Sequence, residues 1–314
     1  MDRLPVIEWA PWWDQTLDRW YREGLPHSLT DNTLIAEYLG LDSMRLYWAR
    51  ALSPALPPPA AHGAALIRDE KEYLHHKNQN TLFSEQPFDR EDLRQWAPKI
   101  RAGHTIMWAA LEGFFWHPRN LLGIEPHLYA FYDQPGLMHR INEDLLQYHL
   151  KTLDLLCQSA TPIFITLAED MSYNHGPMLS KNLFDEFLAP YYRQLLPEIK
   201  NRGIIPFVDS DGDIYPLIPW LLEVGFEGLL PLERMAGVDI NRIRNEFPRF
   251  KMIGAFDKTV MHRGPAALER EFERIRPVMQ SGGYLPGVDH QTPPDVSLAN
   301  YRDYIALLKK FSTM

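Results

Sequence analysis

Residues 204–216 read IIPFVDSDGDIYP, a short apolar run that ends in alternating acids. Apolar residues that follow one another without polar alternation are typical of a strand buried on both faces, as in a parallel sheet. Asp209, Asp211 and Asp213 come next, and Gly212 among them marks a turn. The stretch therefore predicts a buried strand that opens into an acidic loop.

The same order of elements recurs through the second half of the chain: an apolar run, a polar or acidic break, and an amphipathic helix. Five apolar runs fit this order, at 162–170, 204–212, 228–233, 250–258 and 283–290. Regular alternation of strand and helix predicts a parallel sheet with the helices outside it.

The first half is less regular, although 4–10 and 103–116 can each supply a strand. With these, the pattern predicts an α/β fold: a single (β/α)8 TIM barrel, residues 1–314, with an irregular N-terminal extension. The proline-rich stretch within 50–100 predicts an insertion that forms a cap or lid. A doubly wound open sheet is the alternative, but neither GxGxxG nor GxxxxGK[ST] follows any predicted strand.

Composition narrows the function classes. The formal charge is −9 and Lys and Arg form no cluster, so nucleic acid is not an expected partner. No apolar stretch approaches the roughly 20 residues of a membrane span, and residues 1–20 lack the pattern of a signal peptide. We therefore expect a cytoplasmic protein without membrane contact. Cys157 is the one cysteine, in an apolar helical pattern typical of a structural thiol.

Acids follow almost every predicted strand. In a barrel the carboxyl ends of the strands form the active site. One such acid is equally well explained as a helix cap, but many carboxylates gathered together repel each other and need a cation or raised pKa values. The acids, with one histidine beside the last of them, are Glu8, Glu112, Glu169, Asp170, Asp209, Asp211, Glu233, Asp257, Asp289 and His290.

A divalent metal, zinc first, is the simplest cation for this site. Asp209 and Asp211 lie two apart on one strand and so face the same side. We predict that they bind the metal together with Glu169 and His290.

Four stretches together resemble the uroporphyrinogen decarboxylase superfamily: 168–196 (AEDMSYNHGPMLSKNLFDEFLAPYYRQLL), 207–233 (FVDSDGDIYPLIPWLLEVGFEGLLPLE), 253–258 (IGAFDK) and 283–305 (GYLPGVDHQTPPDVSLANYRDYI). The likeness is strong over about 160–312 and loose before it. The resemblance implies a (β/α)8 barrel and two possible chemistries. Decarboxylases of the family use no cofactor, whereas related methyltransferases use zinc and exchange methyl groups with a corrinoid protein.

The resemblance favours the methyltransferase branch. Decarboxylases carry an arginine-bearing RQAGR stretch near the N-terminus, where this chain has VIEWAPWWDQTLDRW with Glu8. Thiol-activating methyltransferases carry H-x-C where this chain has Asp209-Ser210-Asp211. An oxygen-rich site would polarise a substrate oxygen rather than activate a thiol.

We therefore predict a metal-dependent methyltransferase that moves a methyl group from a small donor, such as an aryl methyl ether, to a corrinoid on a partner protein. Alternatives are a cofactor-free carboxy-lyase and a non-catalytic binding protein. Predicted catalytic residues are His290, Asp209 and Tyr173. Predicted substrate-binding residues are Glu8, Trp9, Trp12, Trp116, His175, Glu233 and Asp257.

Overall fold

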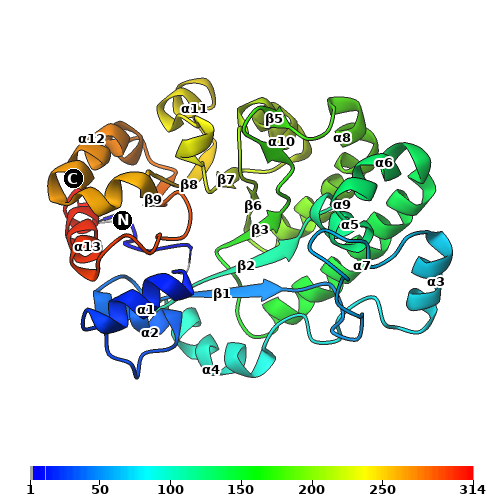
Figure 1. The fold of residues 1–314 in the computed structure, drawn as a ribbon, viewed down its shortest axis with the longest axis horizontal. Helices are drawn as coiled ribbons and strands as arrows, with labels where there is room; N and C mark the ends of the chain where they lie inside the picture. Colours follow the sequence, from blue (N-terminus) through cyan, green and yellow to red (C-terminus); the bar gives the residue numbers. More distant parts are fainter. Residues whose placement is uncertain (1–2, 11, 314) are drawn as a thin grey trace.

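The computed structural model describes residues 3–10 and 12–313, which form a curled sheet of seven parallel strands surrounded by helices (Figure 1). The strands are hydrogen-bonded in the order in which they occur in the chain, so each connection is a crossover outside the sheet. They are β1 (Met44–Ala49), β2 (Ile106–Glu112), β3 (Phe164–Ala168), β6 (Ile205–Asp209), β7 (Gly228–Leu230), β8 (Lys251–Phe256) and β9 (Tyr284–Val288).

Three helices of the second half begin where the sequence supplies a side-chain cap. The side chains of Ser180, Asp239 and Ser297 each accept a hydrogen bond from a backbone N–H in the first turn of the helix that follows. These helices and their neighbours are α7 (Pro135–Cys157), α8 (Lys181–Phe187), α9 (Ala189–Asn201), α10 (Ile218–Val224), α11 (Ile240–Glu246), α12 (Pro265–Gln280) and α13 (Leu298–Ser312). The three with a side-chain cap are α8, α11 and α13.

The described part of the first half supplies six further helices before α7. They are α1 (Asp14–Arg22), α2 (Asn32–Leu39), α3 (Glu70–Asn78), α4 (Arg90–Arg101), α5 (Trp116–Leu122) and α6 (Ile124–Asp133). No described helix is both long enough and apolar enough to cross a membrane. Cys157 ends α7 half-buried, and burial raises the pKa of its thiol.

All five predicted strand–helix units of the second half are confirmed, but the eighth strand is not. The predicted strand 4–10 is irregular. Val6 exchanges hydrogen bonds with Asp42, its carbonyl accepting from the Asp42 N–H and its own N–H donating to the carboxylate at 2.8 Å. Glu8 instead accepts from the N–H of Val288 at 3.2 Å. Hydrogen bonds that involve side chains thus take the place of a backbone ladder between segment 4–10 and its neighbours. The described residues form a TIM-barrel-like sheet of seven strands.

Strand β1 was not recognised from the sequence MRLYWA, because a charged residue stands in it. The Arg45 side chain is only 15% exposed and pairs with Asp31 at 2.5 Å and with Asp92. Thr33 and the ring of Trp96 also contact it. The strand can therefore contain this mostly buried arginine, because the carboxylates of Asp31 and Asp92 neutralise its charge.

Aromatic side chains fill the inside of the curled sheet. Trp108 stacks on Phe164 at 5.1 Å between ring centroids, and Phe164 lies 5.2 Å from Phe207. Trp9 from the irregular N-terminal segment packs against the same interior cluster. A second, larger apolar layer lies between the sheet and the helices. The N-terminal segment thus completes the interior without joining the sheet.

Residues 50–100 contain α3, α4 and irregular chain with one isolated bridge between Leu52 and Phe83. The segment packs on the side of the molecule, where Tyr73 donates to Asp144 of α7 at 2.9 Å. Figure 1 shows α3 near α7 at the outer edge. Its use as a lid stays a prediction.

Phe207→Ala tests the interior packing. We expect the free energy of unfolding to fall by about 3–5 kcal/mol, because a buried ring is lost and its neighbours cannot fill the space. Urea unfolding followed by circular dichroism measures it. Ile163→Ala, at a position 52% exposed just before β3, is the control and should cost less than about 1 kcal/mol. Equal effects would contradict the packing described.

Candidate functional site

The predicted acids do come together, since parallel strands in chain order bring their carboxyl ends to one face of the sheet. Around the ends of β3 and β6 to β9 the chain places five acids, one lysine and one histidine. We call this group the carboxylate cluster: Asp170, Asp209, Asp211, Glu233, Lys258, Asp289 and His290.

Glu169 is fully buried, and its carboxylate binds backbone N–H groups of the loop after β2. Its carboxylate accepts from the N–H groups of Phe114 and Phe115, both at 2.8 Å, and of Trp116 at 3.2 Å, and from the hydroxyl of Tyr192. It thus satisfies the free donors at the start of α5. Burial raises its pKa to about 7, against the lowering effect of these bonds. Gly113 makes room, since a Cβ there would lie 1.9 Å from the Glu169 carboxyl carbon.

The carboxylates of Asp289, Glu233 and Asp257 also accept hydrogen bonds from backbone N–H groups. Asp289 accepts from the N–H of Arg234 at 2.9 Å and of Lys258 at 3.3 Å, which joins the loops after β7 and β8. Glu233 accepts from Gly212 N–H at 3.3 Å, and Asp257 caps its own loop at Thr259. Burial raises the pKa of Asp289 to about 6. Each of the three thus has a structural use, and the contact with substrate predicted for Glu233 and Asp257 stays a prediction.

Asp209 and Asp211 differ, because no described residue donates a hydrogen bond to either carboxylate. The nearest basic group is the His290 ring, with Nε2 3.9 Å from Asp211 Oδ2. Burial, followed by the charges of Asp170 and Asp211, raises the pKa of Asp209 well above its usual range. Burial, Asp170 and Glu233 raise that of Asp211 to about 7. A pKa of about 7 means that Asp211 is protonated in part of the molecules at neutral pH.

Asp170, Lys258 and Arg119 complete the site. The sequence predicts Asp170 only as one of the strand-end acids, without a role, and does not predict Lys258 or Arg119. Asp170 has a left-handed backbone, φ 40°, which is strained for a non-glycine residue and typical of functional positions. Lys258 Nζ lies 3.8 Å from Glu233. The Arg119 guanidinium stacks 4.9 Å from the Trp116 ring centroid and donates to the Asp170 carbonyl at 3.5 Å. In the sequence, Lys258 is marked only by its position after a strand-end acid.

Tyr173 and His175 lie on a small hairpin, β4 (Ser172–Tyr173) and β5 (Gly176–Pro177). The Tyr173 carbonyl accepts from Asp213 N–H at 2.9 Å, which ties the hairpin to the loop that carries Asp211. Gly212 has φ 83°, and a Cβ there would lie 2.7 Å from Tyr173 backbone. Both side chains are exposed, so the hairpin brings a phenol and an imidazole to the rim of the site.

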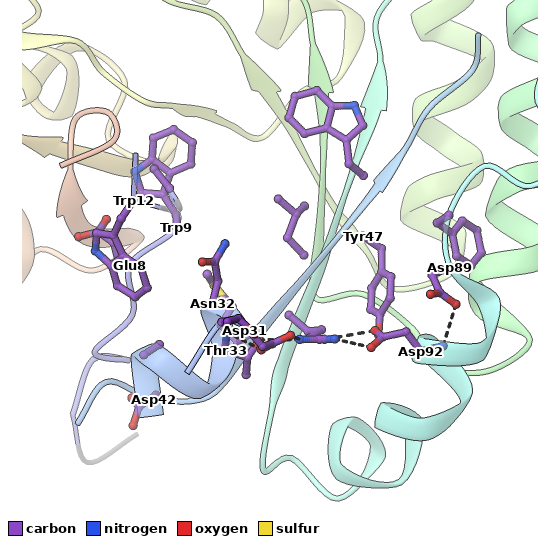
Figure 2. Close-up of a pocket in the computed structure, with 18 residues that line it drawn as sticks. Glu8, Trp9, Trp12, Asp31, Asn32, Thr33, Asp42, Tyr47, Asp89 and Asp92 are labelled. Carbon is purple, nitrogen blue, oxygen red and sulfur yellow. Dashed lines mark hydrogen bonds and ion pairs between the residues drawn. The ribbon is translucent and has the colours of Figure 1, made fainter. Parts of the chain in front are cut away.

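The remaining predicted substrate contacts lie elsewhere. Glu8, Trp9 and Trp12 line a separate cavity of about 550 Å³ beside β1 (Figure 2). Trp9 donates to the Val288 carbonyl at 2.7 Å, and Trp12 packs in the core with its ring centroid 5.9 Å from that of Tyr301. Glu8 and Trp9 thus contact the carboxyl end of β9 at Val288, next to Asp289, but line this cavity.

Within the described part of the chain the predicted ligands form no preformed metal site, and metal binding by them stays a prediction. Among residues 3–10 and 12–313, no group of three or more His, Cys, Asp or Glu side chains is placed to hold a metal ion. Glu169 already accepts four hydrogen bonds, which leaves Asp209, Asp211 and His290 from the predicted set.

Glu8→Gln tests the buried carboxyl beside β9. Burial raises the Glu8 pKa from 4.5 to about 8, so the folded chain keeps a proton that the unfolded chain loses above pH 4.5. The contribution of this group to stability is therefore full at low pH and is lost as pH rises toward 8. The variant should show a shallower fall in melting temperature between pH 5 and 8.

The control for that experiment is Glu125→Gln, at an exposed position on α6, which should leave the pH dependence unchanged. Equal pH dependence in wild type and the Glu8 variant would contradict a buried neutral Glu8. Glu169 and Asp211 add to the slope in both proteins.

Comparison with known proteins gives one family. The model of the uroporphyrinogen decarboxylase (URO-D) family matches residues 119–311, more than half of the chain. Comparison with curated protein sequences found no significant match. Two solved structures illustrate the fold. A methyltransferase from Methanosarcina mazei has a TM-score of 0.68 at 14% identity, covering 99% of this chain and 95% of that chain.

A B12-independent methionine synthase from Shewanella sp. W3-18-1 has a TM-score of 0.50 at 11% identity, covering 73% of this chain and 67% of that chain. At these identities the likeness shows a shared fold.

Proposed function

Because the chain belongs to the uroporphyrinogen decarboxylase family, we propose that it is a methyltransferase that takes a methyl group from a small methylated donor, such as an aryl methyl ether, and passes it to a corrinoid on a partner protein. One observation carries the proposal. Asp209 and Asp211 lie at the end of β6 without any described hydrogen-bond donor, next to His290. The methyltransferase from Methanosarcina mazei supports the choice of branch.

The pair supplies the proton that demethylation requires. When the bond between oxygen and methyl breaks, its electron pair stays on the oxygen, and a carboxyl that is protonated in part of the molecules at neutral pH can protonate that oxygen. Asp211, with a pKa of about 7, is the donor. The corrinoid, when bound, supplies the nucleophile that accepts the methyl group. The products are the free alcohol or phenol and the Asp211 carboxylate, which regains a proton from water.

The other residues orient and support this step. His290 lies 3.9 Å from Asp211 and is partly exposed, so it can return the proton from solvent. Lys258 and Arg119 limit the negative potential that five acids create. The Tyr173 and His175 hairpin lies at the rim, where a donor would enter.

A carboxy-lyase is the second candidate, favoured by the same proton donor with cationic Lys258 near Asp211 and cationic Arg119 near Asp170. Those cations could hold one substrate carboxylate while Asp211 protonates the carbon left by the departing carbon dioxide. The excess of acids disfavours a substrate with many carboxylates. Release of carbon dioxide without methyl transfer would select this reaction.

Asp211→Asn tests the proton donor. We expect kcat for methyl transfer from a methoxylated aromatic compound to reduced cobalamin to fall by about 10²–10⁴-fold, because general acid catalysis contributes this much. Cobalamin absorbance follows the reaction. In wild type the rate should decline above about pH 7, as the acid loses its proton.

Asp213→Asn is the matched control. Its carboxylate accepts only from the N–H of Tyr215 at 3.2 Å and lies two residues further along the same loop. It should keep kcat within about threefold. Full activity of the Asp211 variant, or a rate that rises through pH 7, would refute Asp211 as the acid.

A further inference from the structure

No strand that the structure describes pairs with the outer edge of β1. Ile106 N–H of β2 donates to the Ser43 carbonyl, and Met44 pairs with Ile106 in the parallel register. In a parallel ladder, alternate residues direct both backbone groups to the same neighbour. The backbone N–H and C=O groups of Arg45 and Tyr47 therefore point toward β2, whereas those of Leu46 point away from it.

Two observations support this assignment. The Met44 carbonyl, on the outer edge, accepts from the Thr33 hydroxyl at 2.7 Å. Among the described residues, β9 makes no ladder with β1. The N–H and C=O groups of Leu46 and Trp48 are thus left free along the outer edge of the strand.

A slot lies against this edge, in the gap that an eighth strand would fill. Its volume is about 550 Å³, and it is bounded by β1, the start of α2, the start of α4 and the N-terminal segment (Figure 2). Met44 and Leu46 line it and also pack on the interior of the sheet. Trp9 does the same from the opposite wall. The slot therefore opens from the surface toward the barrel interior.

The walls of the slot carry excess negative charge. Asp31, Asp42, Asp89 and Asp92 line it, whereas Arg45 is the one cation among the lining residues that the structure describes. Asp31 and Asp92 share Arg45. Asp42 pairs with Arg3 at 2.7 Å, and Asp89 caps α4. Glu8 adds no charge at neutral pH. The balance favours a cationic occupant.

We propose that this slot binds an extended segment of a partner polypeptide that carries Lys or Arg side chains, which adds to β1 as a further strand. Free backbone groups on an exposed edge pair with any extended chain, and the pockets beside the edge select its side chains. Apolar residues of the segment would point to Met44, Leu46 and Trp9, and its basic residues would face the aspartates. This use is separate from the carboxylate cluster.

The test uses a defined probe, the peptide acetyl-Lys-Val-Thr-Val-Lys-amide, with acetyl-Glu-Val-Thr-Val-Glu-amide as its acidic counterpart. Binding to the full chain is measured by tryptophan fluorescence, since Trp9, Trp12 and Trp48 line the slot. Hydrogen–deuterium exchange of residues 44–48 gives the second readout. We expect the basic peptide to slow exchange at Leu46 and Trp48, and the acidic peptide to bind at least tenfold more weakly.

Leu46→Pro removes the outward N–H, and proline is tolerated on a strand edge whose N–H is not in the ladder. Leu46→Ala keeps the N–H and removes only side chain. Pairing by the backbone predicts that the proline variant binds about fivefold or more weakly than the alanine variant, as expected for one lost hydrogen bond. Circular dichroism checks that both variants fold.

Three results would overturn the proposal. One is unchanged exchange at Leu46 and Trp48 in wild type with millimolar basic peptide, a readout that does not depend on any variant. The others are equal binding of the two peptides, and a greater loss in Leu46→Ala than in Leu46→Pro, which would indicate a side-chain pocket for a small molecule.

Discussion

The architecture depends on carboxylates that accept hydrogen bonds from the backbone of neighbouring loops. A parallel sheet ends in loops whose N–H groups have no ladder partner, and each must find an acceptor. Glu169 provides one for the loop after β2, Glu233 for the loop after β6, and Asp289 for the loops after β7 and β8. The loops are thereby fixed relative to each other.

Two acids, Asp209 and Asp211, do not take part in this binding of backbone among the residues described. Once the carboxylates that bind backbone N–H groups are set aside, Asp209 and Asp211 stand out, because no residue that the structure describes donates a hydrogen bond to either carboxylate. Their charges are close to one another and to Asp170, and burial removes the water that would stabilise them. Protonation is then the least costly state, since it relieves both desolvation and repulsion. The crowding of carboxylates thus raises the pKa of Asp211 into the range where the proposed proton transfer occurs.

The incomplete barrel follows from how the N-terminal segment is held. Its apolar residues belong in the interior, and Trp9 reaches it, but Glu8 and Val6 bind through side-chain contacts to β9 and to Asp42. A segment anchored in this way cannot also pair along β1. One edge of the sheet therefore remains free, and natural sheets normally cover or charge such an edge. Here the aspartates around the slot supply the charge.

The sequence by itself determined the alternation of strand and helix from residue 162 onward, because continuous apolar runs and capped amphipathic helices are local patterns. It also located the acids at the strand ends. It missed β1, whose Arg45 is tolerated only through Asp31 and Asp92, which are distant in the chain. Only the tertiary structure decided which acids serve the backbone and which stay free. That choice depends on N–H groups of other loops, such as Phe114 for Glu169, and no local pattern records where those loops will lie.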